Sequence, residues 1–195
     1  MGKEELSHEE SLTVIQNMID MAKNKINETG FHFMLWGMLV ILASLTQYLM
    51  ITYDRVEHSN WVWLIMSAIG VPIALIYEYK RKKVVQTTTK FDRIYGFLWL
   101  GFGITLAVTI FVSISFQVNP IAFILSLVGL ATFVSGAIYR FKPLVAGAII
   151  FWFAAILCTQ FERLDQLLIN AAAIFAGYII PGILLWAKAK KEKNV

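Results

Sequence analysis

Six long runs of apolar residues restrict what this chain can fold into more than any other feature of its sequence. The runs cover residues 31–53, 61–79, 94–118, 121–139, 143–161 and 167–187. As a helix, each run is long enough to cross a hydrocarbon layer about 30 Å thick, and none carries a charge near its middle. With 58% hydrophobic and 15% charged residues, the chain also has too little polar surface for a soluble domain. The sequence therefore predicts an all-α, polytopic membrane protein with six transmembrane helices.

The positively charged residues predict the orientation of these helices. If the N-terminus faces the cytoplasm, all of the 17 lysines and arginines except Arg55 and Arg163 fall in cytoplasmic segments. Such an excess is the signature of the positive-inside rule. We therefore expect three in-out-in hairpins, with both termini in the cytoplasm. The same cations are placed to meet anionic lipid headgroups at the inner leaflet, and this placement argues against a nucleic-acid partner.

The first 30 residues form a segment of their own, ahead of a transmembrane bundle at 31–187 and a basic cytoplasmic tail at 188–195. Ser7 and Glu10 fit a capping box, and Gly30 is expected to end the helix. Apolar positions recur at three- and four-residue steps on one face of this predicted amphipathic helix. They are Leu12, Ile15, Ile19, Ala22 and Ile26.

This helix has three open interpretations: it lies under the inner leaflet, packs on the protein's own loops, or docks another helix. Helices that bind membrane surfaces usually carry many lysines and arginines on their polar face. Here the polar face is near neutral and rich in asparagine. That composition favours a protein partner or self-association through the heptad-like seam of residues 12–26.

Small and polar residues inside the spans predict close helix packing or, alternatively, a polar path. Small or hydroxyl side chains recur every four residues down the third span, at Gly101, Thr105, Thr109 and Ser113. Buried polar residues of other spans are expected to bond across helices, and prolines are expected to kink two of them. These residues are Gln47, Asn170, Pro72 and Pro181.

The loops expected outside the membrane contain a weak candidate for a divalent-cation site. Its oxygen ligands and single imidazole come from the first and last hairpins. The candidate ligands are Asp54, Glu57, His58, Glu162 and Asp165. The alternative is that these short loops are simply acidic and solvated. No cofactor is implied elsewhere, and the single cysteine excludes an intramolecular disulfide.

Two segments resemble a known group of proteins. They are residues 139–144 (YRFKPL), which lead to Gly147, and residues 177–182 (GYIIPG). Together with the capped N-terminal helix, they resemble a group of small six-span bacterial inner-membrane proteins without assigned function. The resemblance implies a bacterial plasma membrane and says nothing about chemistry.

The functional expectations rest on what the spans lack and on the N-terminal helix. No motif for nucleophilic, metal-dependent or phosphate chemistry is present, so we do not expect an enzyme. We expect a non-enzymatic membrane protein with a regulatory or scaffolding role through its N-terminal helix. The alternative is a small transporter or channel-like protein for an uncharged or lipid-like ligand. That alternative requires a cavity between the second, third and sixth spans.

Overall fold

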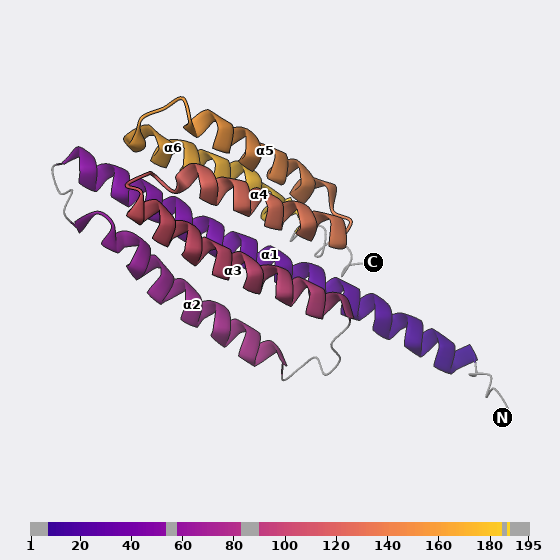
Figure 1. The fold of residues 1–195 in the computed structure, drawn as a ribbon. Helices are drawn as coiled ribbons and strands as arrows, with labels where there is room; N and C mark the ends of the chain where they lie inside the picture. Colours follow the sequence, from indigo (N-terminus) through magenta and orange to yellow (C-terminus); the bar gives the residue numbers. More distant parts are fainter. Residues whose placement is uncertain (1–7, 54–57, 83–89, 185–186, 188–195) are drawn as a thin grey trace.

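The computed structural model describes residues 8–53, 58–82, 90–184 and 187, and the side chains within 30–53, 58–80, 93–184 and 187. This part of the chain is helical apart from short connections (Figure 1). The helices are listed here in chain order: α1 (His8–Thr52), α2 (Trp61–Lys82), α3 (Lys90–Ser115), α4 (Ile121–Ile138), α5 (Lys142–Cys158), α6 (Arg163–Ile174) and the π-helix η2 (Phe175–Ile179). The predicted all-α architecture is confirmed.

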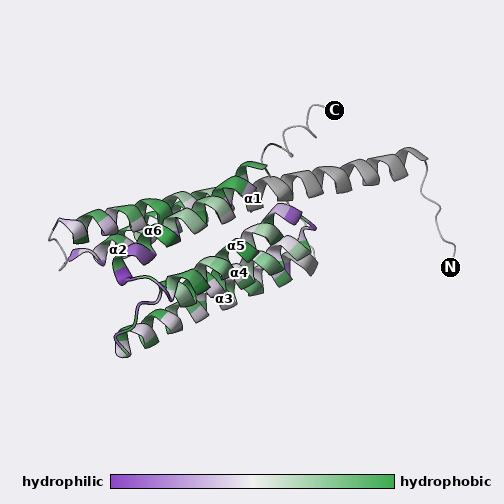
Figure 2. Ribbon diagram, turned by 90° about the horizontal axis from the view of Figure 1, so that it is seen from above, coloured by the Kyte–Doolittle hydropathy of each residue, from purple (hydrophilic) through white to green (hydrophobic). Residues whose placement is uncertain are grey.

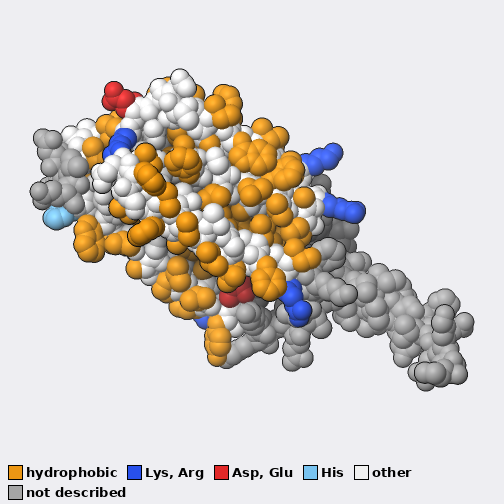
Figure 3. All heavy atoms as spheres, viewed as in Figure 1, with side chains coloured by type: hydrophobic (Ala, Val, Ile, Leu, Met, Phe, Trp, Pro, Cys, Tyr) orange, Lys and Arg blue, Asp and Glu red, His pale blue; other side chains and the backbone are white. Residues whose placement is uncertain are grey.

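Five segments of the described chain are long and apolar enough to cross a membrane. They are Gly30–Thr52, Trp61–Lys80, Arg93–Ser115, Ile121–Ile138 and Arg163–Leu184. Helix α5 is also apolar but has 17 residues, one short of the shortest of these segments. Hydrophobic side chains cover the face of the molecule shown in Figure 3, and most of its Lys and Arg side chains lie at one end. The expectation of a membrane protein with several apolar spans is met.

The helices form two layers (Figure 2). In one layer α1 lies between α2 and α6, and in the other α4 lies between α3 and α5. Helices α6 and η2 join the layers, because both also pack on α5. The turns that join α3 to α4 and α5 to α6 lie at one end of the bundle, where α1 also meets α2; we call this the hairpin end. The opposite end, which carries Lys80, Arg93, Arg140 and Lys142, is the basic end.

Helix α1 does not end at Gly30, so that part of the prediction is wrong. Its 45 residues form one continuous helix from His8 to Thr52. A glycine inside a helix costs only about 1 kcal/mol, which packing can offset. The packing here comes from the last turns of the sixth span, where Gly182 lies against Met34 and the Gly30 carbonyl. The segment 8–29 is therefore joined rigidly to the first transmembrane segment.

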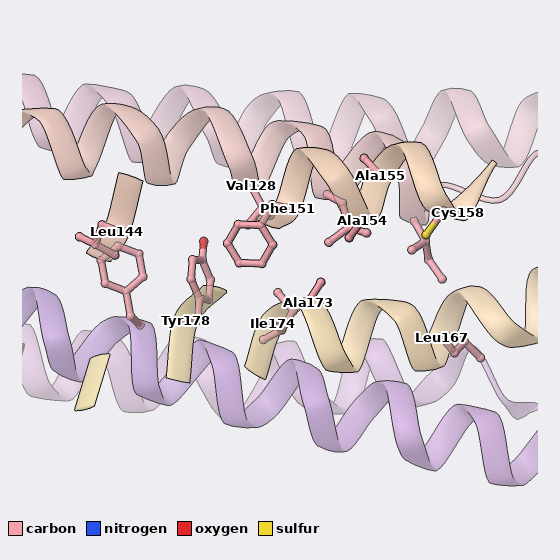
Figure 4. Close-up of a cluster of buried hydrophobic side chains, with 13 residues drawn as sticks. Val128, Leu144, Phe151, Ala154, Ala155, Cys158, Leu167, Ala173, Ile174 and Tyr178 are labelled. Atoms are coloured by element: carbon pink, nitrogen blue, oxygen red, sulfur yellow. The ribbon is translucent and has the colours of Figure 1, made fainter. Parts of the chain in front are cut away.

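The core sits where α5 meets α4, α6 and η2 (Figure 4). The rings of Phe151 and Tyr178 pack edge to face there, with centroids 5.0 Å apart and planes at 81°. Leu125, Leu144 and Phe151 are fully buried. Glycines permit this close packing: a Cβ at Gly129 would lie 2.6 Å from the Trp152 ring. The two layers therefore meet through one aromatic and aliphatic core.

Candidate functional site

The five seam residues of the N-terminal helix, Leu12, Ile15, Ile19, Ala22 and Ile26, lie on a segment whose backbone is helical. Their side chains lie outside the part of the chain whose side chains are described. The structure therefore gives the seam its helical spacing and its connection to the first span. What covers the seam stays a prediction.

The buried polar residues of the first span bond to neighbouring helices. Gln47 accepts from Trp63 Nε1 at 2.6 Å and donates to Asn60 Oδ1 at 2.9 Å, which ties α1 to the start of α2. One turn earlier, Ser44 Oγ accepts from Asn170 Nδ2 at 2.8 Å, which ties α1 to α6. Ser44 is fully buried and Asn170 is 4% exposed. These contacts are of the cross-helix kind that we expected for Gln47 and Asn170.

The proline in the sixth span follows a π-helical turn. Pro181 has no N–H with which to bond the Gly177 carbonyl, four residues earlier. In the same region Ile180 donates to the Phe175 carbonyl, five residues back, as a π-turn requires. The Gly177 carbonyl lies against Gly147 of α5, where a Cβ would be 2.5 Å from its oxygen. This part of η2 therefore touches α5 backbone to backbone.

The two prolines differ in their surroundings. Pro181 is buried in the bundle, whereas Pro72 lies inside α2 and is exposed. A buried hydroxyl pair lies beside η2, where the Thr132 hydroxyl and the Tyr178 hydroxyl are 3.3 Å apart. Thr132 also donates to the Val128 carbonyl of its own helix at 2.7 Å. No pattern in the sequence predicted this contact of Tyr178 with Thr132, because the two residues are 46 positions apart.

The small and hydroxyl residues that recur every four positions along α3 lie in two different environments. They are Gly101, Thr105, Thr109 and Ser113, which form the stripe on α3. Gly101 has no atom within 4 Å of the position a Cβ would take, and Thr105 is exposed, with its hydroxyl bonded to the Gly101 carbonyl of the same helix. The expected helix contact is therefore missing at this end of the stripe, among the residues described. Thr109 and Ser113 instead line a groove between α3 and α4.

This groove has a volume of about 630 Å³ and is lined mainly by apolar side chains. Its walls are a face of α3 from Val108 to Ser113, Phe116 and Val118 of the turn that follows, and a face of α4 from Phe123 to Leu127. Arg163, the first residue of α6, donates through Nη2 to the carbonyl of Gln117, which lies between Phe116 and Val118. The groove thus starts beside a cation at the hairpin end.

The described residues of the predicted cation site do not lie close together. His58, Glu162 and Asp165 are all exposed, and Asp54 and Glu57 lie outside the described residues. Within the part of the chain that the structure describes, no three acidic, histidine or cysteine side chains come close enough to hold a metal. The five-residue site is therefore not assembled from the three ligands that can be placed.

One side-chain hydrogen bond at the basic end links α1 to α2. His32 Nε2 lies 3.4 Å from Glu78 Oε1, and the rings of Phe31 and Tyr77 stack beside it with centroids 3.9 Å apart. Sequence reasoning had no signal for this pair, because its members are 46 positions apart. The pair fixes the basic end of α2 to α1.

Comparison with known proteins gives no match from which a function could be transferred. No protein-family model, no curated protein and no solved structure matches it. The resemblance to six-span bacterial membrane proteins therefore stays a prediction.

Proposed function

We propose that this protein crosses the plasma membrane of a bacterium six times, with both termini in the cytoplasm. Five of the six spans are the long apolar segments described above. Helix α5, the fifth in chain order, supplies the remaining one, because it packs against both α4 and α6 and its 17 residues reach about 25 Å. The described cations support the orientation: Lys80, Arg93, Arg140 and Lys142 lie at the basic end and Arg163 at the other. By the positive-inside rule the basic end faces the cytoplasm.

Within this topology, the protein is a non-enzymatic docking protein with a regulatory or scaffolding role, and segment 8–29 carries its docking surface. The observation that supports this role is the continuity of α1. At 1.5 Å per residue its 45 residues extend about 67 Å, roughly twice the thickness of the hydrocarbon layer. A helix that continues a transmembrane span keeps the axis of that span. Segment 8–29 therefore extends into the cytoplasm and does not turn to lie along the leaflet.

The register of α1 gives the seam a defined direction. Eighteen residues make five full helical turns, so positions 18 apart share one line along the helix. Ile15, Ile19 and Ile26 stand on the same lines as Phe33, Gly37 and Ser44, which the bundle buries. Within the membrane, this side of α1 packs against α6 and η2. The seam of residues 12–26 thus continues, toward the N-terminus, the face of α1 that packs on α6 and η2 within the bundle.

The partner that fits such a seam is another amphipathic helix. Leu12, Ile15, Ile19, Ala22 and Ile26 follow the 3-4-3-4 spacing of a coiled-coil seam. Each fully buried Leu or Ile contributes about 1.5–3 kcal/mol in water, so an uncovered seam is costly. Either a helix of a partner protein or the same helix of a second copy covers it.

The test is crosslinking in native membranes from a photoreactive residue at position 22. The variant carries Ile15→Asp and Ile19→Asp. The matched control carries Asn17→Asp and Asn24→Asp, which add the same charge to the opposite face. We expect a specific protein crosslink, to a partner or to a second copy, that the seam variant loses and the control keeps. Crosslinks only to lipid or to the protein's own loops would overturn the docking role.

A transport function has less support. It required a cavity between the second, third and sixth spans, whereas the groove that the structure forms lies between α3 and α4. Helix α2 packs mainly on α1. A transporter for an uncharged or lipid-like ligand is therefore the alternative, and substrate uptake by proteoliposomes that contain the purified protein would establish it.

A further inference from the structure

The groove between α3 and α4 plays no part in the docking proposal, and its shape and position point to a ligand. Its lining positions include Val108 and Val112 of α3 and Phe116 directly after that helix, which follow each other at four-residue steps. This line covers about 12 Å along the helix axis. The groove therefore starts at the hairpin end and runs from there toward the middle of α3. Its volume of about 630 Å³ falls within the range of small-molecule sites.

The end of the groove near the turn carries a cation. Gln117 adopts a left-handed backbone conformation with φ of 57°, which turns the chain between α3 and α4. Its carbonyl accepts a hydrogen bond from the Arg163 guanidinium, so that cation lies beside the groove residues Phe116 and Val118. A guanidinium has five N–H donors, and this contact uses one of them. Arg163 is exposed, and no salt bridge joins it to a carboxylate of the described residues.

We propose that the groove binds one acyl chain of an anionic phospholipid, whose phosphate is held by Arg163. The arrangement matches the two parts of that molecule: a cation where the headgroups lie, and an apolar channel that leads from it toward the bilayer centre. The lining residues Val108, Phe116 and Phe123 are themselves exposed, so the groove is open to the hydrocarbon layer. A lipid can therefore enter from the side.

The choice of lipid depends on the cation Arg163, because the acyl chain itself adds no preference. A chain that moves from the bilayer into the groove gains no hydrophobic free energy, because lipid tails are as apolar as the groove walls. The rings of Phe116 and Phe123 line the groove, and their fit to an acyl chain contributes to binding. The preference for an anionic headgroup comes from Arg163, since a cation at a membrane surface attracts anionic lipid.

Helix α2 supplies an internal reference surface. It is as exposed as α3 and is also apolar, for example at Leu64 and Leu75, which are 62% and 63% exposed. Among its described neighbours at the hairpin end no lysine or arginine is present, and it lines no part of this groove. Lipid that merely surrounds the protein would contact both helices equally.

The experiment uses the full chain in proteoliposomes with a trace of phosphatidylglycerol that carries a photoreactive acyl chain. A parallel sample uses phosphatidylcholine with the same chain. After irradiation, mass spectrometry measures the label on residues 108–127 and on residues 64–75. We expect the first segment to carry several times more phosphatidylglycerol label than the second.

Two variants with matched controls make the result specific. Arg163→Gln should lower the ratio of phosphatidylglycerol to phosphatidylcholine label in the groove about fivefold, the effect of one surface cation. Lys142→Gln, which removes an exposed cation at the basic end, should leave that ratio unchanged. Val112→Phe fills the groove and should lower the label from both lipids, whereas Leu64→Phe should not.

Three results would overturn the proposal. One is equal labelling of the two segments, which means bulk lipid only. Another is a groove label ratio that Arg163→Gln does not change; this variant alters an exposed side chain and decides the matter even if Val112→Phe does not fold. The third comes from a companion sample with a photoreactive residue at position 112: a crosslink from it to a second copy of the chain would mean that protein, and not lipid, covers the groove. None of these results depends on the seam of residues 12–26.

Discussion

Replacing Gly147 by alanine tests whether α5 and η2 meet backbone to backbone. A Cβ at this position would lie 2.5 Å from the Gly177 carbonyl oxygen and 3.1 Å from its Cα. Neither atom belongs to a side chain that can rotate away, so the helices have to separate. Overpacking of this kind costs about 1–3 kcal/mol. Gly101→Ala is the matched control, because nothing lies within 4 Å of its new Cβ.

At Gly101, alanine should stabilise the helix by about 0.5–1 kcal/mol, the usual difference from glycine in a helix interior. Gly147→Ala gains the same helix preference, so the two variants should differ by the overpacking cost alone, about 1–3 kcal/mol. For a chain of this size that difference corresponds to roughly 2–12 °C in melting temperature. The assay is thermal unfolding of both purified variants in the same detergent, followed by circular dichroism. A Gly147→Ala protein that melts at or above Gly101→Ala would refute the close backbone contact.

Three further predictions concern contacts across helices and the topology. A double-mutant cycle with Ser44→Ala and Asn170→Ala should give a coupling of about 0.5–1.5 kcal/mol in unfolding by sodium dodecyl sulfate, because their bond is buried; additive effects would contradict it. Gln47→Leu should lower the melting temperature, since it leaves Trp63 Nε1 and Asn60 without their partner, whereas Thr105→Ala, which removes an exposed bond within one helix, should leave it unchanged. In a Cys158→Ala background, an impermeant maleimide added to intact cells should label Gln160→Cys and spare Lys142→Cys; the reverse pattern would invert the proposed orientation.

Sequence length and hydropathy were enough to predict the helical architecture. A span needs only a sufficient number of apolar residues, so each run could be recognised without knowledge of its neighbours. Asn170 and Gln47 could likewise be predicted to bond across helices, because an unsatisfied amide inside a membrane is costly. Their partners could not be predicted. Ser44 lies 126 positions from Asn170, and nothing in a single sequence links them.

The faces of the helices were the least predictable feature. In a soluble protein polarity separates the outer face from the inner, but in a membrane both faces are apolar. The stripe on α3 looked uniform in sequence, yet Gly101 is exposed and Ser113 is 2% exposed in the groove. The surroundings of the glycines could not be predicted either: Gly147 contacts the backbone of Gly177, whereas Gly101 has no near neighbour. Only the three-dimensional packing distinguishes these positions.

The continuity of α1 changes how its N-terminal segment should be interpreted. A helix that ended at Gly30 could rotate and lie on the membrane or on the protein's own loops. An unbroken helix from His8 to Thr52 instead holds the seam residues on the lines of Phe33, Gly37 and Ser44. A partner helix on that seam therefore continues the side of α1 on which α6 and η2 pack. Inserting two residues after Gly30 would rotate the seam by about 200° and should abolish the crosslink from position 22. Inserting seven residues, close to two full turns, should restore it.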